Sequence, residues 1–311
     1  MQLQTRRSND LSVGRSMPDG LKLFLMAVPF IIFVFAFSYV PLFGWIYAFF
    51  DYIPGIPLLQ SPFIGFKSFI TIYQSGGELV RVLRNTLVLS FLGILSSPLP
   101  VIFAILLNEV RRSKFRKFVQ VTTTLPNFIS WIVVFSLSFA LFSGDGVYNM
   151  FLNKLGLPAP STNVLGNNDI VWAFQWAIST WKSLGWGAII YIATISGIDS
   201  ELYDAANVDG ANRFQTIMNV TVPGLYSTYL VLLLLGISNM LSNGFEQFFV
   251  FFNPLVADKI EVLDYYVYKI GMLTNDYPQA TALGMAKTVI SVTLLFTANF
   301  ISKRLRGESI V

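Results

Sequence analysis

Six long apolar stretches alternate with polar, turn-rich segments along the 311-residue chain. Each stretch is close to the roughly 20 residues that an α-helix needs to cross the hydrocarbon core of a bilayer. Pro and Gly inside several of them are compatible with a spanning helix, because neighbouring helices satisfy the backbone groups that they free. The pattern therefore predicts an all-α membrane protein with about six transmembrane helices. The windows are residues 22–45, 86–108, 118–142, 170–195, 225–250 and 281–302.

The first apolar stretch decides where the membrane domain begins. It runs from Leu23 to about Phe50, which is too long for the hydrophobic core of a signal peptide, and no small-residue cleavage site follows it. We therefore expect it to be retained as a spanning helix. No internal repeat or low-complexity tract interrupts the remaining sequence. The expected organisation is a cytoplasmic N-terminal segment at residues 1–20 and one transmembrane domain at residues 21–311.

Composition agrees with a protein that is solvated by lipid. Hydrophobic residues make up 54% of the chain and charged residues 12%, and the mean hydropathy is +0.61, so polar surface is too scarce to cover a soluble globule. The chain has no Cys and no His, which excludes disulfides, thiol nucleophiles, imidazole bases and the usual zinc sites. We expect no catalytic residue and no metal site in this chain.

Lys and Arg are unevenly distributed over the connections between the predicted helices. The side that holds both termini carries thirteen of them, and the opposite side carries six. Because cytoplasmic loops carry the excess of positive charge, both termini are expected in the cytoplasm and the stretches 46–85, 143–169 and 251–280 outside. The basic residues form short clusters and no stripe with interleaved aromatic side chains, so the net charge of +4 does not indicate a nucleic-acid partner.

The connection between the fourth and fifth predicted spans, residues 199–223, departs from this charge pattern because it carries four acidic residues. Its first part is expected to form a short helix. Asp199 or Ser200 can cap that helix, and Glu201 and Asp204 complement the positive end of its dipole.

Gly210 can end or bend this helix, and a second short helix is expected from Asn212 to about Val222. Pro223 is expected to break the second helix just before the fifth membrane span. Two short helices at the membrane face, with small residues that allow close approach, suit an element that docks into a groove of a partner protein. An ordinary amphipathic connector would show the same local pattern, so the residues alone leave both interpretations open.

The spacing in this loop resembles the EAA loop of ABC importer permeases, whose pattern is Glu-Ala-Ala, three residues, Gly, nine residues, then Ile, any residue and Leu-Pro. The corresponding positions are Asp204, Ala205, Ala206, Gly210, Val220, Val222 and Pro223. The departures are Asp for Glu and Val for both Ile and Leu. The resemblance implies a coupling helix that fits a cleft in a cytosolic ATPase. It assigns this coupling to Glu201, Asp204, Ala205, Ala206, Gly210 and Pro223.

Short motifs extend the resemblance over nearly the whole chain, to the permeases of bacterial oligosaccharide and polysaccharide-fragment importers. They include Glu201-Leu202-Tyr203, Asp209-Gly210-Ala211, Asn85-Thr86-Leu87, Asn108-Glu109-Val110-Arg111 and Phe128-Ile129-Ser130-Trp131. The resemblance implies a bundle like that of type I ABC importer permeases, in the bacterial cytoplasmic membrane, that forms half of a translocation pathway for an oligosaccharide.

The same resemblance implies several partners. They are cytosolic ABC ATPase subunits, a second and commonly different permease, and an extracytoplasmic solute-binding protein that delivers the carbohydrate. The chain lacks the Gly-x-x-x-x-Gly-Lys-Ser/Thr phosphate loop and is not expected to hydrolyse ATP. ATP and Mg²⁺ are therefore expected in the partner ATPase, with no cofactor in this chain.

Polar residues inside the predicted spans are candidates for the substrate pathway, because their cost in hydrocarbon places them against a cavity or another helix. On a continuous fifth helix, Gly236, Asn239, Ser242, Asn243 and Glu246 would form one stripe with Gln247 beside it. The fourth span combines rings with hydrogen-bonding groups, which suits the apolar faces and hydroxyl edges of sugars. The candidates are Gln175, Trp176, Lys182, Asn239, Asn243, Glu246 and Gln247.

Several alternatives stay open on the sequence alone. Asn239 and Asn243 can bridge neighbouring helices without lining a path. An ABC permease for peptides or amino acids would share the coupling loop. An ion-coupled secondary transporter would use Lys182, Glu246 and Lys287 as coupling charges, with Glu246 as a candidate partner for the two lysines, but the absence of inverted-repeat signs and the docking loop argue against it. A sensor or scaffold would need no polar stripe.

Overall fold

The computed structural model describes residues 18–74, 76–156 and 163–306, and the chain forms two compact units, residues 1–47 and 48–311. The expected cytoplasmic segment 1–20 lies almost entirely outside the described residues. The N-terminal unit is helical from Asp19 onward, as α1 (Asp19–Val34), a π-helical turn and the start of a 3-10 helix. No residue of α1 is buried. A helix that is apolar all round and has no buried face suits a lipid environment.

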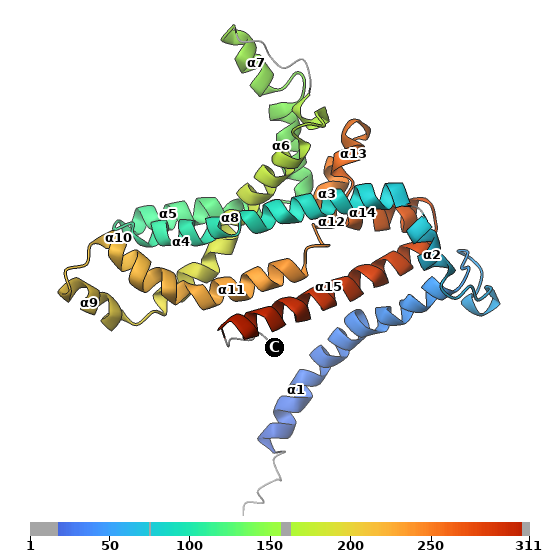
Figure 1. Ribbon diagram of the computed structural model, residues 1–311, viewed down its shortest axis with the longest axis horizontal. Helices are drawn as coiled ribbons and strands as arrows, with labels where there is room; N and C mark the ends of the chain where they lie inside the picture. The colour runs from blue at the N-terminus through green and yellow to red at the C-terminus, as the bar shows by residue number, and fades with distance from the viewer. Residues whose placement is uncertain (1–17, 75, 157–162, 307–311) are drawn as a thin grey trace, which may run out of the picture. The chain divides into compact units, whose positions relative to one another are not determined.

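The described residues of the second unit form helices joined by short irregular segments, with no named strand (Figure 1). Its helices are α2 (Lys67–Gln74), α3 (Gly76–Leu95), α4 (Pro98–Asn108), α5 (Ser113–Thr124), α6 (Trp131–Phe142), α7 (Val147–Lys154), α8 (Val171–Ser196), α9 (Ser200–Val208), α10 (Arg213–Thr216), α11 (Val222–Ser238), α12 (Phe245–Phe251), α13 (Ala257–Ile260), α14 (Leu263–Tyr268) and α15 (Tyr277–Arg306).

Five helical stretches among the described residues are long and apolar enough to cross a membrane. The fourth predicted window corresponds to α8, whose 26 residues include polar positions that lower its hydropathy. The all-α membrane fold is therefore confirmed. The five stretches are Asp19–Phe49, Gly76–Asn108, Trp131–Lys154, Arg213–Ser238 and Tyr277–Arg304.

The windows 118–142 and 225–250 are not single helices, so two predicted spans need correction. In the first, α5 ends at Thr124, a 3-10 turn covers Leu125–Phe128, and α6 starts at Trp131. Pro126 lies in that turn, and because it has no N–H it cannot continue the helical ladder. In the second window, the chain leaves the helix after Ser238 and α12 begins only at Phe245.

The break in the second of these windows ends at a glycine. Gly244 has a φ of +88°, a backbone conformation that side chains with a Cβ rarely adopt. The window 86–108 also contains an irregular step, because α3 ends at Leu95 and α4 begins at Pro98. The three irregular segments place non-helical backbone inside predicted membrane spans.

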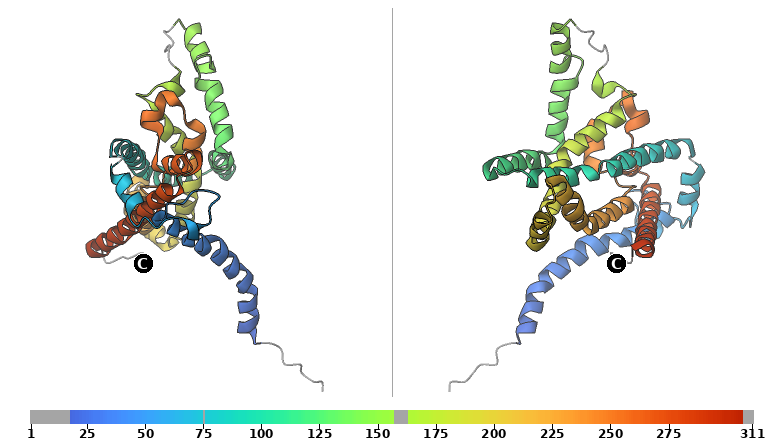
Figure 2. Two further views of the ribbon diagram at one scale, coloured as in Figure 1. Left: turned by 90° about the vertical axis from the view of Figure 1, so that its right-hand side faces the viewer. Right: turned by 60° about the vertical axis from the view of Figure 1, so that its left-hand side comes forward.

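The central helix of the second unit is α8, which packs against α3, α4, α5 and α11. Figure 2 shows these helices from two further sides, with α8 in yellow-green and the α3–α4 path in teal. Small residues allow this close approach. At Gly185, an added Cβ would lie 2.2 Å from the carbonyl oxygen of Thr123 on α5. Beside it, Ala104 of α4 and Ala188 of α8 are both fully buried.

A buried ionic cluster attaches the segment after α12 to α3. The Glu261 side chain is 2% exposed, and its carboxylate lies 2.6 Å from Arg81 Nη2 and 2.9 Å from Lys269 Nζ. Burial opposes the charge of Lys269, but hydrogen bonds to Glu261 and Glu78 outweigh it and raise the Lys269 pKa. Asn85 donates to the backbone oxygen of Glu261 at 3.0 Å. These bonds hold α13 and α14 against α3.

Replacing Gly185 with Ala is expected to loosen the contact between α8 and α5. The added methyl group overlaps backbone atoms that cannot rotate away, so the loss is about 2 kcal/mol of folding free energy. The matched control is Gly236→Ala, where no atom lies within 4 Å of the added Cβ. The apparent melting temperature of the purified protein in detergent should fall for Gly185→Ala alone. Equal melting temperatures for both variants would contradict this packing.

Replacing Glu261 with Gln is expected to destabilise the fold, because two cations lose their buried carboxylate at a cost of about 3 kcal/mol. Asp258→Asn is the control, since Asp258 is 53% exposed where it pairs with Arg84, and an exposed pair contributes less than about 1 kcal/mol. Thermal unfolding in detergent distinguishes the two variants. A Glu261→Gln protein as stable as the control would show that the cluster does not hold this segment.

Candidate functional site

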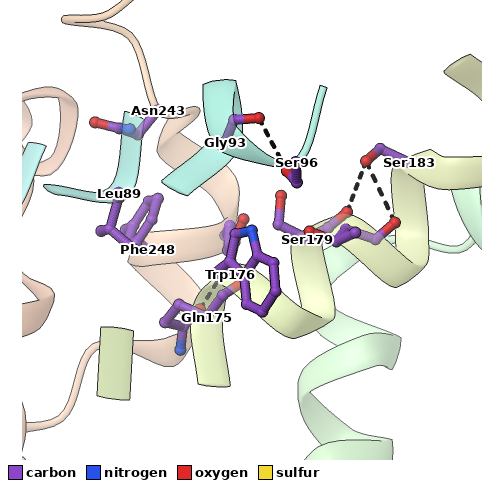
Figure 3. Close-up of a pocket in the computed structure, with 11 residues that line it drawn as sticks. Leu89, Gly93, Ser96, Gln175, Trp176, Ser179, Ser183, Asn243 and Phe248 are labelled. Atoms are coloured by element: carbon purple, nitrogen blue, oxygen red, sulfur yellow. Dashed lines mark hydrogen bonds between the residues drawn. The ribbon is translucent and has the colours of Figure 1, made fainter. Parts of the chain in front are cut away.

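A cavity of about 140 Å³ lies where α3, α8 and the α11–α12 region meet (Figure 3). None of the side chains that line it is charged, and most carry a hydroxyl, an amide or an indole N–H. Figure 3 shows these side chains approaching from segments that are far apart in the sequence. The lining residues are Leu89, Gly93, Ser96, Gln175, Trp176, Ser179, Thr180, Ser183, Asn243, Gln247 and Phe248. We call this cavity the polar pocket.

Two buried amides join α8 to α12 at the polar pocket. Gln247 Nε2 donates to Gln175 Oε1 at 2.8 Å and to the Gln175 backbone oxygen at 3.1 Å. Gln175 is 2% exposed and Gln247 is 4% exposed. Because an unpaired buried amide is costly, this bond gives the two side chains one defined arrangement.

A second amide is held from the opposite wall. Asn243 Nδ2 donates to Ser90 Oγ at 2.8 Å, and Ser90 Oγ in turn donates to the backbone oxygen of Met240. The Oδ1 atom of Asn243 and the Nε1 atom of Trp176 are buried and have no hydrogen-bond partner within the described part of the chain. Two residues that line the pocket thus carry a buried acceptor and a buried donor without a partner, and a hydroxyl group offers both complementary functions because it donates and accepts.

Four of the seven candidate pathway residues line this pocket: Gln175, Trp176, Asn243 and Gln247. The expected stripe along a continuous fifth helix is wrong, because α11 ends at Ser238 before most of its members. The side chain of Asn239 donates to the backbone oxygen of Leu235 at 2.9 Å and caps the end of α11. Glu246 is exposed in the first turn of α12, where a negative charge favours the helix dipole.

Lys182 does not line the polar pocket. Its Nζ atom donates to the backbone oxygens of Pro126 at 3.2 Å and Asn127 at 2.7 Å, and it lies 5.3 Å from the centre of the Trp131 ring. The ion pairs of the described residues do not include one with Glu246. The break between α5 and α6 frees carbonyl groups, and the buried ammonium group satisfies them.

Several hydroxyl residues of the pocket were not among the candidates. Thr180 and Ser183 follow Trp176 at helical spacing and share its face of α8. That spacing was visible in the sequence and could have identified them. Ser96 could not be found in this way, because it reaches the pocket from the step between α3 and α4.

The loop 199–223 forms the first helix that its sequence predicts. Asp199 caps α9 by accepting from the backbone N–H of Glu201 at 3.0 Å. Gly210 has a φ of +75°, and the N–H of Ala211 bonds to the oxygen of Ala206 at 2.9 Å. A glycine with positive φ followed by this bond is the usual helix-ending motif.

The second helix differs from the expectation. It begins as predicted at Asn212, which forms a capping box with Gln215. Pro223 does not end it, because a π-helical turn at Ile217–Thr221 joins α10 directly to α11. The wider turn accommodates the proline that lacks an N–H. One helix of 26 residues, Arg213–Ser238, therefore connects the loop to the break that carries Asn243.

The loop presents apolar side chains to its surroundings. Leu202, Val208, Phe214 and Met218 are 53%, 89%, 71% and 47% exposed. The Tyr203 and Thr221 hydroxyls lie 3.1 Å apart and hold α9 against the following helix. The six proposed coupling residues lie on α9, on the turn after it and on α11, and all except Ala206 are classed as exposed. Exposed apolar groups on an ordered element are typical of a docking surface.

The sequence and the fold both match known transport proteins. Residues 96–307 match the family of binding-protein-dependent transport system inner membrane components. Protein LplB of Bacillus subtilis (strain 168) is 36% identical over 93% of this chain and 90% of its own length. The polygalacturonan/rhamnogalacturonan transport system permease protein YteP of the same organism is also 36% identical, over 93% of this chain and 89% of its own length.

A solved structure shares the fold over nearly the whole chain. It is a chain of a bacterial alginate ABC transporter in complex with an alginate pentasaccharide-bound periplasmic protein. The TM-score is 0.83 and the identity is 32%, with 94% of this chain and 97% of that chain covered. The expected type I ABC permease bundle is thereby confirmed. This chain belongs to the family of binding-protein-dependent transport system inner membrane components, as a permease subunit of an ABC transporter.

Proposed function

We propose that this chain forms half of the translocation pathway of an ATP-driven importer for an oligosaccharide. The observation that carries the proposal is the uncharged polar pocket between α3, α8 and the α11–α12 break. Its amides, hydroxyls and Trp176 ring offer the hydrogen bonds and the apolar face that a sugar needs. The relatives named for polygalacturonan/rhamnogalacturonan transport and for alginate transport support the same substrate class.

The pocket dimensions suit one sugar ring at a time. Its volume is about 140 Å³, and a cavity of about 150 Å³ is enough to hold one benzene molecule. A chain of sugar units would therefore pass the pocket ring by ring. The opposite wall of the pathway is assigned to a second, different permease subunit.

Energy for transport is assigned to a separate cytosolic ATPase that binds ATP and Mg²⁺. The exposed apolar surface of the loop 199–223 suits a cleft in that partner, with Glu201, Asp204, Ala205, Ala206, Gly210 and Pro223 in or beside it. Movement of α9 reaches the pocket because the helix Arg213–Ser238 is continuous as far as the break. In this proposal a tilt of the helix Arg213–Ser238 changes the side of the membrane to which the pocket opens, which is alternating access.

The proposed topology places both termini in the cytoplasm and the substrate-binding protein on the outer side. Figure 1 shows α9 and α10 at the same end of the unit as the turn between α4 and α5, and this turn and the start of α5 carry the basic residues at 111–117. The basic residues are assigned to the cytoplasm by their charge, and the loop 199–223 is assigned to it by its resemblance to a coupling loop. Both therefore lie at the same end of the unit. The stretches 46–85, 143–169 and 251–280 are then available to the binding protein.

The other hypotheses are not favoured by the site. A secondary transporter would need intramembrane charges free to bind an ion, but Lys182 is bonded to two carbonyl groups and Lys287 is paired with Asp264. The relatives named for polygalacturonan/rhamnogalacturonan transport and for alginate transport do not favour a peptide or amino-acid substrate.

The direct test is affinity purification of the tagged chain from its native membranes. An ATPase, a second permease and a binding protein should co-purify. ATPase activity should rise with one member of a panel of pectin-derived and alginate-derived oligosaccharides. Recovery of the chain alone would contradict the proposal.

Replacing Gly210 with Trp is expected to abolish ATPase association and leave membrane insertion intact. The indole would occupy the partner's cleft, and the φ of +75° is unfavourable for it. Gly55→Trp is a matched control on the opposite side of the membrane, because Gly55 has a φ of +95° and both glycines have open space around them. Quantitative recovery of the ATPase with each variant decides the result. Equal recovery would remove the loop from the coupling interface.

Replacing Asn243 with Leu is expected to reduce uptake of the stimulating sugar about tenfold, through the loss of one hydrogen-bonding group in the pathway. Assembly with the ATPase should not change. Asn239→Leu is the control, because Asn239 lies in the same break but bonds to its own helix. Uptake into proteoliposomes is the measurement, and equal rates for the two variants would remove Asn243 from the pathway.

A further inference from the structure

The break between α11 and α12 is held by a side chain that lies outside the polar pocket. Asp264, on α14, accepts a hydrogen bond from the backbone N–H of Gly244 at 3.2 Å through Oδ2. Its other carboxylate oxygen, Oδ1, pairs with Lys287 of α15. Both charged side chains are largely shielded, with 16% exposure for Asp264 and 20% for Lys287.

The position of the ion pair between Asp264 and Lys287 indicates its role at the break. Backbone groups released from a helix inside a membrane need partners, and a carboxylate is a strong acceptor for a free N–H. Lys287 neutralises the carboxylate, so that a single negative charge is not left without a partner in a region of low dielectric. The pair therefore allows a charged acceptor to stand beside Gly244.

The residue next to Gly244 is Asn243, which lines the polar pocket. Its amide is held by Ser90 of α3, and the following backbone N–H is held by Asp264 of α14. The Ser90 hydroxyl uses its hydrogen to donate to the backbone oxygen of Met240, so it can only accept from Asn243. Asn243 must therefore turn its Nδ2 group, and not its oxygen, toward Ser90. Asn243 is thus oriented from both sides, and its Oδ1 atom is the one left unpaired.

We infer that Asp264, supported by Lys287, is a positioning residue that sets the orientation of Asn243 in the pocket through its hydrogen bond to the Gly244 N–H. The inference rests on the proposed role of the pocket in the sugar pathway. The required chemistry at position 264 is an acceptor for the Gly244 N–H. The ionic attraction between α14 and α15 is secondary to it.

Two reciprocal double variants separate the acceptor from the ion pair. Asp264→Asn with Lys287→Gln removes both charges and keeps an amide oxygen that can accept from Gly244. Asp264→Lys with Lys287→Asp keeps the opposite charges, but the ammonium group at position 264 cannot accept a hydrogen bond. A purely structural ion pair would be restored in the second variant.

The absence of cysteine from the chain allows a measurement that needs no sugar. Ser242→Cys places one thiol in the break, at an exposed position. Its rate of labelling by a water-soluble maleimide is measured in the complex purified with the full chain and held in nanodiscs. The control is Ser183→Cys, which is also exposed and lines the pocket from the continuous helix α8.

Labelling of Ser242→Cys should rise about tenfold in the charge-exchanged variant, as expected for the loss of a hydrogen bond to a charged group. It should stay within about twofold in the neutral variant, because the acceptor remains. The rate at Ser183→Cys should change in neither. Ordinary labelling in the charge-exchanged variant, or an equal rise in the neutral one, would overturn the inference. A rise at both thiols would also overturn it, because the pair would then hold the whole bundle.

A failure of this inference can be distinguished from a failure of the proposed function. Labelling reports only how the break is held, whereas the uptake defect of Asn243→Leu reports whether the pocket carries sugar. A positive labelling result together with normal uptake by Asn243→Leu would keep the positioning of Asn243 and remove its role in transport.

Discussion

The structure depends on one constraint, that every backbone polar group inside the membrane must be satisfied within the protein. Three predicted spans contain non-helical steps, and two of these are closed by charged side chains from other elements. Lys182 serves the carbonyls between α5 and α6, and Asp264 serves the N–H of Gly244. Charged side chains that would be costly in hydrocarbon thus act as hydrogen-bonding partners of backbone groups.

Two of these steps, between α3 and α4 and between α11 and α12, are also where the pocket forms. Continuous helices packed side to side leave little space between them, but a step lets the chain deliver a side chain such as Ser96 or Asn243 into the interior. The neutral amides and hydroxyls there can exchange hydrogen bonds with a passing sugar. A fixed charge would hold an ionic group strongly and impede its release, so an uncharged lining suits a path better than a storage site.

The helix Arg213–Ser238 connects this pocket to the opposite end of the unit. Pro223 lies inside this helix and would normally interrupt it, but the π-helical turn at Ile217–Thr221 keeps the helix continuous. Its first turns carry exposed apolar side chains, and its last turn ends at the break. One rigid element therefore joins a surface suited to a partner with a pocket suited to a sugar.

Much of this protein is determined by its sequence alone. The apolar windows, the Asp199 cap, the positive φ at Gly210 and the spacing of the loop 199–223 depend on local chemistry, so the membrane fold and the family follow from them. Gln175, Trp176, Asn243 and Gln247 were recognised as pathway candidates because polar groups in apolar segments need a reason to be there. Their roles in the substrate pathway are a prediction, which the uptake experiment tests at Asn243.

Only the tertiary structure decided which of the remaining polar residues meet. Lys182 and Gln175 occupy similar sequence surroundings, yet the lysine serves a distant break and the glutamine faces the pocket. The break between α11 and α12 ends at Gly244, whose N–H bonds to Asp264, 20 residues further along the chain. Local patterns predict where a helix can form, but the partner of a freed backbone group comes from a segment that no local pattern identifies.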